Sequence, residues 1–252
     1  MIGAFIIVRL SSSRLPKKAM MEILDIPMLE LMVERVRVSN LVDKVVIATS
    51  TEPSDDLLED LAKKLEIGCY RGSLENVMDR VNNAAKEHGC DTIIELLGDN
   101  PLIHSDLIDD VVGLYQNGAY DYAATVTKEY PVLEANSEMR LFSIGVRVQV
   151  YSRKVAERYI DYPEYMKDQE KSTTAYIFEH PEVFKVGYLE AKDRWYFMNR
   201  PDLTFAVNYR KNFDLVREIF ERNYPINKYF PMESVYDQLD KEKFLYLMMG
   251  NE

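Results

Sequence analysis

The chain has 252 residues, and its 31 Lys and Arg side chains stand against 42 Asp and Glu side chains, a formal net charge of −11. This excess of negative charge argues against nucleic acid or an anionic membrane surface as the main partner, because both reward a basic face. With 47% hydrophobic and 29% charged residues, the composition is that of a globular protein and excludes a disordered or fibrous chain.

Apolar strands and amphipathic helices alternate along the first half of the chain. The expected strands are 5–8, 44–49, 68–70, 92–97 and 122–126, and the expected helices are 28–36, 57–65, 74–88 and 105–115. Repeated strand-then-helix units predict an α/β fold in which helices sandwich a mostly parallel sheet. Ligands bind such sheets at the carboxyl ends of the strands. The loops after Val8, Thr49 and Leu97 are therefore the first places to look for chemistry.

The second half of the chain is less regular. Apolar and polar residues alternate from Val146 to Tyr151, which predicts a strand with one face in water. A last strand is expected at Thr204–Val207 and a helix at Phe213–Arg222. An amphipathic helix, or a pair of helices, is expected to close the chain at Met232–Met249.

Two features bear on the compartment. Cys69 and Cys90 are too few for a disulfide framework and, without clustered histidines, for a zinc site. The opening run MIGAFIIVRL meets Arg9 after a few apolar residues, too early for a signal peptide or a membrane span. We expect a cytoplasmic protein that forms one domain over residues 1–252.

The loop after the first strand is basic. Its sequence, RLSSSRLPKK from Arg9 to Lys18, holds four cations and three hydroxyls. Serine and backbone N–H groups donate to phosphate oxygens, Arg pairs with two oxygens at once, and Lys adds a point charge. The loop matches neither GxxxxGK[ST] nor GxGxxG. By itself it is compatible with a phosphate site and with a solvated basic loop.

A carboxylate follows another expected strand. Asp99 lies in the turn Gly98-Asp99-Asn100-Pro101, directly after strand 92–97 and before a helix with Ser105 at its N-cap. At a strand's carboxyl end it can hold Mg²⁺ carried by a nucleotide. As an ordinary turn residue, Asp99 would only accept hydrogen bonds from backbone N–H groups. This is the simpler interpretation when Asp99 is considered alone. Together with the basic loop, it favours nucleotide chemistry.

Three stretches in order resemble the cytidylyltransferases that activate acidic sugars, a family that includes acylneuraminate cytidylyltransferases and the branch named after spore coat polysaccharide biosynthesis protein F. They are FIIVRLSSSRLPKKAM, DKVVIATSTEPSDDLLEDLAKKLEIGCYRGSLENVMDR and LLGDNPLI. The likeness covers about the first 125 residues and returns weakly at AYIFEHPEVFKVG and DLTFAVNYRKNFDLVREIF. It implies a glycosyltransferase-A-like, nucleotide-diphosphosugar transferase fold.

The resemblance also implies a reaction and its residues. An acceptor oxygen of a sugar or sugar-like acid would attack the α-phosphorus of a nucleoside triphosphate, with CTP expected, and release pyrophosphate for surface polysaccharide assembly. The implied catalytic residues are Arg14, Lys18 and Asp99, and the implied Mg²⁺ ligands are Asp99 and Asn208. The implied nucleotide-binding residues are Arg9, Ser11, Ser12, Ser13, Arg71, Gly72 and Ser73, the last three near base and ribose.

Several positions depart from the family pattern. In the basic loop, Ser11 and Lys17 stand in place of glycines, and Asn208 stands in place of a second metal-binding Asp. Arg147 and Gln149 stand where the family usually has acidic residues, and Glu95 stands where a basic residue is common. The segment Glu170-Lys171-Ser172 stands in place of an Arg-Glu-His-like segment. These changes gather on the acceptor side and at the second metal position. They leave two alternatives open: a nucleotide-binding homologue that has lost transfer activity, and a glycosyltransferase that uses a finished nucleotide sugar.

Residues 131–176 are the expected interface. Enzymes of this family are commonly homodimers in which a second-half excursion reaches the partner's site. The resemblance therefore implies a homodimer, with residues 131–176 of this chain as the dimerisation or lid segment.

Overall fold

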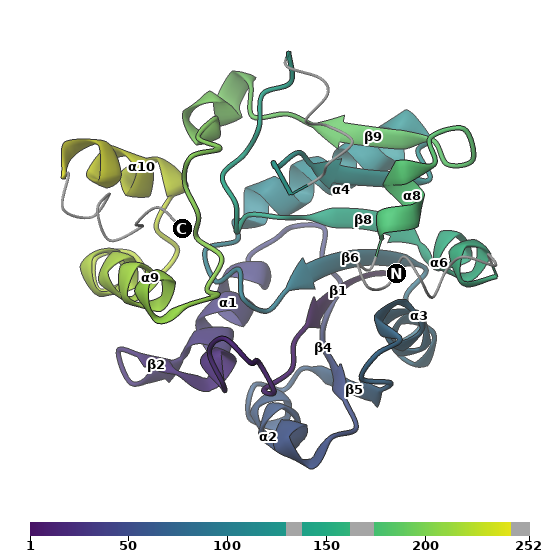
Figure 1. Cartoon of the computed structure of the whole chain (residues 1–252), viewed down its shortest axis with the longest axis horizontal. Coiled ribbons are helices and arrows are strands. Elements are labelled where there is room, and N and C mark those ends of the chain that lie inside the picture. The colour runs from purple at the N-terminus through teal and green to yellow at the C-terminus, as the bar shows by residue number, and fades with distance from the viewer. Residues whose placement is uncertain (130–137, 162–173, 243–252) are drawn as a thin grey trace.

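A seven-stranded sheet forms the centre of the computed structural model, which describes residues 1–129, 138–161 and 174–242 (Figure 1). In spatial order the strands are β5 (Gly68–Gly72), β4 (Lys44–Ser50), β1 (Ile2–Ile7), β6 (Thr92–Leu97), β8 (Gln149–Ser152), β7 (Tyr122–Thr125) and β9 (Val186–Leu189). Every one of these strands except β8 runs in the same direction. The mostly parallel α/β fold predicted from the sequence is confirmed.

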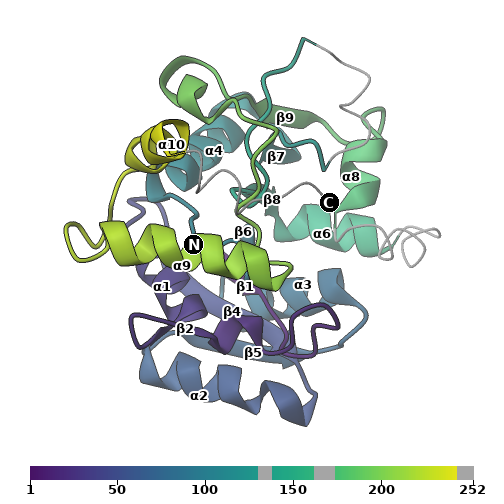
Figure 2. The same cartoon turned by 60° about the vertical axis from the view of Figure 1, so that its left-hand side comes forward.

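Helices cover both faces of this sheet. On one face lie α1 (Met28–Val36), α2 (Asp56–Lys64), α4 (Ser105–Gly118), α9 (Arg210–Asn223) and α10 (Met232–Lys241). On the other lie α3 (Val77–Glu87), α6 (Arg153–Ile160) and α8 (Ala175–Glu179). Figure 2 shows α9 lying across the α1 side of the molecule. Burial on both faces explains why β1, β4 and β6 are nearly continuous apolar runs.

Shorter elements complete the described chain. A two-stranded hairpin, β2 (Glu22–Ile23) and β3 (Ile26–Pro27), follows the basic loop. Short 3-10 helices occupy Lys18–Met20, Pro53–Asp55 and Asp193–Met198. None of the described helices has the length and apolar character that a membrane crossing requires.

The register of the parallel strands brings the predicted loops together. Ile7 at the end of β1 pairs with Ala48 in β4 on one side and with Leu97 at the end of β6 on the other. The chain leaves β1 and β6 at the same level, so the basic loop and the turn at Asp99 emerge side by side. This placement comes directly from parallel pairing.

The strand predicted to have one wet face is buried on both. Gln149 and Tyr151 have no exposed surface, and Arg147 just before the strand is 7% exposed. The reason is position: β8 lies inside the sheet between β6 and β7 and is covered by α6. Its polar residues are therefore paired with other side chains and not with water.

Residues 204–207 form no strand, contrary to the sequence prediction. Thr204 makes one isolated bridge with Ile144, and Val207 N–H donates to the carbonyl of Asp99 at 2.8 Å. The segment is apolar because it crosses the buried end of the sheet instead of extending an edge. β9, which the sequence pattern did not reveal, forms the edge beyond β7.

Two other predictions fall partly outside the described residues. Of the proposed dimerisation or lid segment, 131–176, the structure describes 138–161 and 174–176, and the first of these ranges supplies β8 and α6. Of the closing helix expected at 232–249, the structure describes the part up to residue 242, which contains α10.

Candidate functional site

A cavity of about 410 Å³ lies at the carboxyl ends of β1 and β6. Its walls are the basic loop, the turn after β6 and the segment that leads into α3. Among the residues predicted from the sequence, those that line it are Arg9, Ser12, Ser13, Arg14, Lys18 and Asp99. The size and the convergent polar groups are those of a small-molecule site.

The basic loop is anchored by a buried carboxylate. Asp55, with no exposed surface, accepts from Leu10 N–H at 2.8 Å and from the hydroxyls of Thr49 and Ser50 at 2.9 and 2.5 Å. Burial by itself would raise the pKa of Asp55, but the hydrogen bonds from Ser50, Leu10 and Thr49 outweigh it and hold that pKa below its usual value. Asp55 thus ties the start of the loop to β4.

We expect Asp55→Asn to lower the free energy of unfolding by about 3 kcal/mol at pH 7, because bonds to a charged acceptor are lost in a buried site. A depressed folded-state pKa gives stability that is complete above the unfolded value of about 3.9 and is lost as the pH falls through the lower folded value. The difference in unfolding free energy between wild type and Asp55→Asn should therefore become smaller on acidification below about pH 4. Urea unfolding at pH 7 and at low pH measures it. Asp60→Asn, on the exposed side of α2, is the control and should change little.

Lys18, Asp99 and Asn208 meet at one point. The Lys18 ammonium donates to Asp99 Oδ2 at 2.8 Å and to Asn208 Oδ1 at 3.4 Å, although these partners lie 81 and 190 residues away in the chain. The side chains of Lys18 and Asp99 are only 13% and 23% exposed. The structure therefore brings together the cation and the two metal positions predicted from the sequence.

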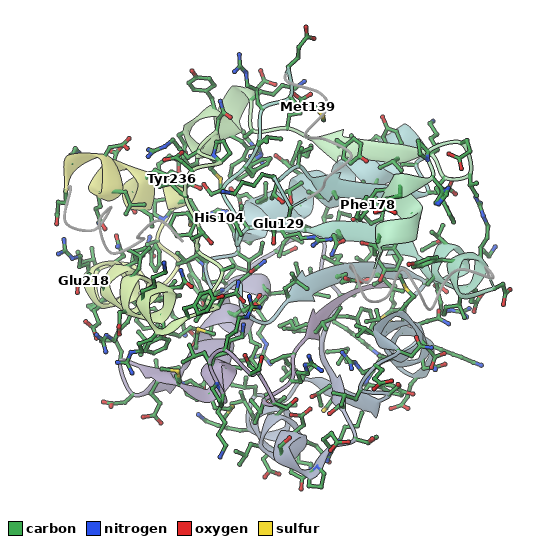
Figure 3. The ribbon with its side chains drawn as sticks, viewed as in Figure 1. His104, Glu129, Met139, Phe178, Glu218 and Tyr236 are labelled. Atoms are coloured by element: carbon green, nitrogen blue, oxygen red, sulfur yellow. The ribbon has the colours of Figure 1, made fainter. Side chains whose placement is uncertain are left out.

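Asn208 is held by the segment that crosses the strand ends. Its backbone N–H and that of Tyr209 donate to Asn212 Oδ1 at the start of α9. Upstream, the Phe205 ring packs edge-on against Tyr236 of α10, with ring centroids 5.6 Å apart. Figure 3 labels Tyr236 on α10, beside this segment. The position of Asn208 thus depends on α9, which begins two residues later, and on α10 further along the chain.

Asp99 and Asn208 fit a nucleotide-borne Mg²⁺. They offer one carboxylate and one amide oxygen, and a single ammonium reaches both. Mg²⁺ in nucleotide sites commonly takes one or two carboxylates and fills its remaining positions with phosphate oxygens and water. Within the described residues, no group of three or more His, Cys, Asp or Glu could hold a metal. The donor set therefore suits a metal that is shared with a phosphate ligand.

Arg80 of α3 is a site residue that sequence reasoning missed. It lines the cavity and is 2% exposed, and its Nη1 donates to the carbonyl of Ser73 at 2.7 Å. Its Nε is buried without a hydrogen-bond partner. Burial lowers the pKa of Arg80 to about 10, so it stays charged at neutral pH. A cation on the apolar face of a helix, three residues after Val77, was the signal that could have found it.

Arg71 does not line the cavity. Its guanidinium turns toward α2, where it contacts Asp56 at 2.6 Å and Glu59 at 3.1 Å, and it donates to the carbonyls of Ser50 and Glu52. These contacts link β5 to α2, and the base or ribose contact that the resemblance implies for Arg71 stays a prediction. Gly72 and Ser73 are also absent from the lining, although Ser73 positions Arg80.

The remaining loop residues have distinct surroundings. Ser12 Oγ accepts from Leu15 N–H at 3.3 Å and so shapes the loop, whereas Ser11 is exposed and lies outside the lining. The Arg14 guanidinium lies over the ring of Tyr209, 5.6 Å from its centroid. This contact connects the basic loop to the start of α9.

Three of the positions that depart from the family pattern bond to one another. Gln149 Nε2 donates to Glu95 Oε1 at 3.0 Å, while Gln149 Oε1 accepts from Arg147 Nη2 at 2.8 Å. The Tyr151 hydroxyl donates to the other Glu95 oxygen at 2.5 Å. An amide at position 149 can serve a carboxylate and a guanidinium together, so these departures form one compensated network. Glu170-Lys171-Ser172 lie outside the described residues.

Comparison with known proteins gives a consistent result. Residues 4–224 match the family model described as Cytidylyltransferase. Spore coat polysaccharide biosynthesis protein SpsF of Bacillus subtilis is 27% identical over 85% of this chain and 84% of its own length. A 3-deoxy-manno-octulosonate cytidylyltransferase of Bdellovibrio bacteriovorus is 27% identical over 62% of this chain and 60% of its own.

A solved structure from another organism shares the fold over the whole chain. A cytidylyltransferase from Leptospira borgpetersenii superposes with a TM-score of 0.84 at 22% identity, covering 100% of this chain and 98% of that one. At this identity the likeness establishes the architecture, and the family match rests on the sequence.

Proposed function

The chain belongs to the cytidylyltransferase family and is a nucleotidyltransferase, and from that premise we propose that it transfers CMP from CTP to a sugar or sugar-like acid. The observation that carries this proposal is the meeting of Lys18, Asp99 and Asn208 beside a cavity lined by arginines. In the proposed reaction an acceptor hydroxyl releases its proton to solvent, and its oxygen bonds to the α-phosphorus. The bond from that phosphorus to the bridging oxygen breaks, and pyrophosphate leaves.

The residues of this chain would act by positioning and by stabilising charge. Arg9, Arg14 and Arg80 would pair with triphosphate oxygens, and Lys18 would supply a point charge near the site of transfer. Asp99 and Asn208 would hold Mg²⁺, which when bound neutralises phosphate charge and favours departure of pyrophosphate. The paired donors of each guanidinium also fix the orientation of the chain of phosphates.

The acceptor is proposed from the relatives. The Bacillus protein is named for spore coat polysaccharide biosynthesis and the Bdellovibrio enzyme for 3-deoxy-manno-octulosonate, an acidic sugar. We therefore place the acceptor among acidic sugars that enter surface polysaccharides. The test measures pyrophosphate release with Mg²⁺ from CTP, UTP, GTP and ATP across a panel of such sugars. Release that requires CTP and one acidic sugar supports the proposal, and no release from any pair contradicts it.

Asn208 favours a second candidate, a homologue that binds nucleotide without transferring it. Asn is a neutral and weaker ligand for Mg²⁺ than the carboxylate usual at this position of the family. This candidate predicts calorimetric binding of CTP with no turnover, and recovery of turnover by Asn208→Asp. Turnover by the unchanged protein excludes it. Binding of a finished nucleotide sugar in preference to CTP would instead point to a glycosyltransferase.

Arg80→Met separates a nucleotide contact from a structural one. We expect it to weaken CTP binding about 10- to 100-fold, the cost of one charge-assisted contact to phosphate. Thermal stability should fall less than in Arg71→Met, because Arg80 loses the bonds from Nη1 to the carbonyls of Ser73 and Leu74 while its buried Nε has no hydrogen-bond partner to lose. Arg71→Met is the matched control: it should lower the melting temperature, because it breaks the link to α2, and leave CTP affinity nearly unchanged. Calorimetry measures the CTP affinity and thermal melting the stability of both variants, and the opposite pattern would support the nucleotide contact predicted for Arg71.

We also propose, on the resemblance alone, that the protein is a homodimer, and, on its content of two cysteines, that it is cytoplasmic. Light scattering on the purified protein distinguishes the mass of two chains from that of one. A monomer at all concentrations would contradict this part of the proposal and leave the proposed reaction standing.

A further inference from the structure

Resting on the proposed function, we propose that Lys18 is a tethered cation that competes with Mg²⁺ for Asp99 and Asn208, so that the metal binds only together with the nucleotide. The carrying observation is that one ammonium contacts both oxygens, at 2.8 and 3.4 Å. These are the donors that the metal would need. A divalent ion and the ammonium cannot share them, because like charges at such a distance repel strongly in a half-buried site.

The charge of the site explains why the competition matters. Asp99 is the one carboxylate that Lys18 contacts within the described part of the chain, and the amide of Asn208 adds no charge. The ammonium therefore neutralises the local carboxylate completely. A metal arriving alone would have to displace Lys18 and leave it without a partner, beside Arg9 and Arg14 in the same cavity wall.

A triphosphate removes this obstacle. Its oxygens give the Lys18 ammonium a new partner inside the same cavity, and the four-carbon stem allows the ammonium to swing while the backbone stays in its turn of 3-10 helix. Asp99 and Asn208 then become free for the metal that accompanies the nucleotide. Metal and nucleotide thus strengthen each other's binding by the same factor, as linkage requires.

The test measures Mn²⁺ binding by electron paramagnetic resonance in the absence of nucleotide. We expect Lys18→Met to bind Mn²⁺ about tenfold or more tightly than wild type, because a cation has been removed from the metal position. Lys17→Met is the control, since Lys17 is an exposed cation of the same loop, and it should behave as wild type does. If wild type binds Mn²⁺ alone as tightly as Lys18→Met, the inference is wrong.

A second variant locates the metal. Adding Asp99→Asn to Lys18→Met should abolish the gain in Mn²⁺ affinity. If the tighter Mn²⁺ binding persists in the double variant, the ion lies elsewhere and the inference is wrong. If Lys18→Met does not fold, as judged by circular dichroism, Lys18→Gln replaces it with the same expected results. CTP titration of wild type with Mg²⁺ tests the proposed function separately. Failure to bind CTP refutes that function, whereas the nucleotide-free Mn²⁺ measurements decide the role of Lys18 by themselves.

Discussion

Replacing Asp99 with Asn is expected to lower the rate of nucleotidyl transfer about 10³-fold, since metal-based charge stabilisation is worth several kcal/mol. The substitution keeps the size of the side chain and removes its charge. Asp99 provides the one carboxylate at the point where Lys18 and Asn208 meet within the described residues. Without it, the amide of Asn208 is the remaining protein oxygen, and a neutral ligand holds Mg²⁺ weakly.

The fold should survive this change. The segment at 204–208 is tied to residue 99 through the backbone, by the bond from Val207 N–H to the carbonyl, which the substitution leaves intact. The measurements are the Mg²⁺-dependent part of CTP binding by calorimetry and pyrophosphate release with the acceptor found in the panel. Asp106→Asn, an exposed change at the start of α4, is the control. A variant at position 99 that keeps full activity would show that the metal is held elsewhere.

Replacing Gln149 with Glu is expected to lower the free energy of unfolding by about 3 kcal/mol or more at pH 7, the cost of an uncompensated buried charge. Gln149 Nε2 is a donor to Glu95, and both side chains are essentially without exposed surface. A carboxylate at 149 would set two negative charges about 3 Å apart in a buried site. Arg147 can pair with one of the two carboxylates, but it does not replace the hydrogen bond that Gln149 Nε2 donates to Glu95.

The exchange of the two side chains supplies the decisive control. In the double variant Glu95→Gln/Gln149→Glu an amide again faces a carboxylate, so most of the lost stability should return, and a double-mutant cycle measures the coupling. The loss of unfolding free energy in the single variant Gln149→Glu should also become smaller on acidification, because a protonated carboxyl can donate a hydrogen bond to the neighbouring carboxylate. Urea unfolding at pH 7 and pH 5 provides both readouts. A single variant as stable as wild type would mean that the network at position 149 has no energetic role.

Local sequence patterns determined the scaffold and part of the site. The alternation of apolar runs and amphipathic segments predicted α1, α2, α4 and the strands β4 and β6 close to their observed bounds, and it located β1, which begins three residues before the predicted Phe5. The reason is that these elements bury whole faces, and burial imposes a period that can be read in one dimension. Parallel strands also end at a common edge. For this reason the basic loop and the turn at Asp99 could be expected at the same edge of the sheet, whereas the contact between Lys18 and Asp99 could not.

Contacts between distant residues decided the rest. The direction of the Arg71 side chain depended on Asp56 and Glu59 of α2, and the burial of Arg80 depended on how α3 lies against the sheet. Alternation from Val146 to Tyr151 suggested a wet face. Only the insertion of β8 between β6 and β7 turned those polar residues into a buried network.

The sequence by itself determined the fold class, the family and the loops that carry the chemistry, because periodicity and short motifs are properties of neighbouring residues. The tertiary structure alone decided which cations face the cavity, which merely join two elements, and that Lys18 reaches both Asp99 and Asn208. Those outcomes depend on side-chain directions and on pairings across as many as 190 residues of chain, which no local pattern encodes.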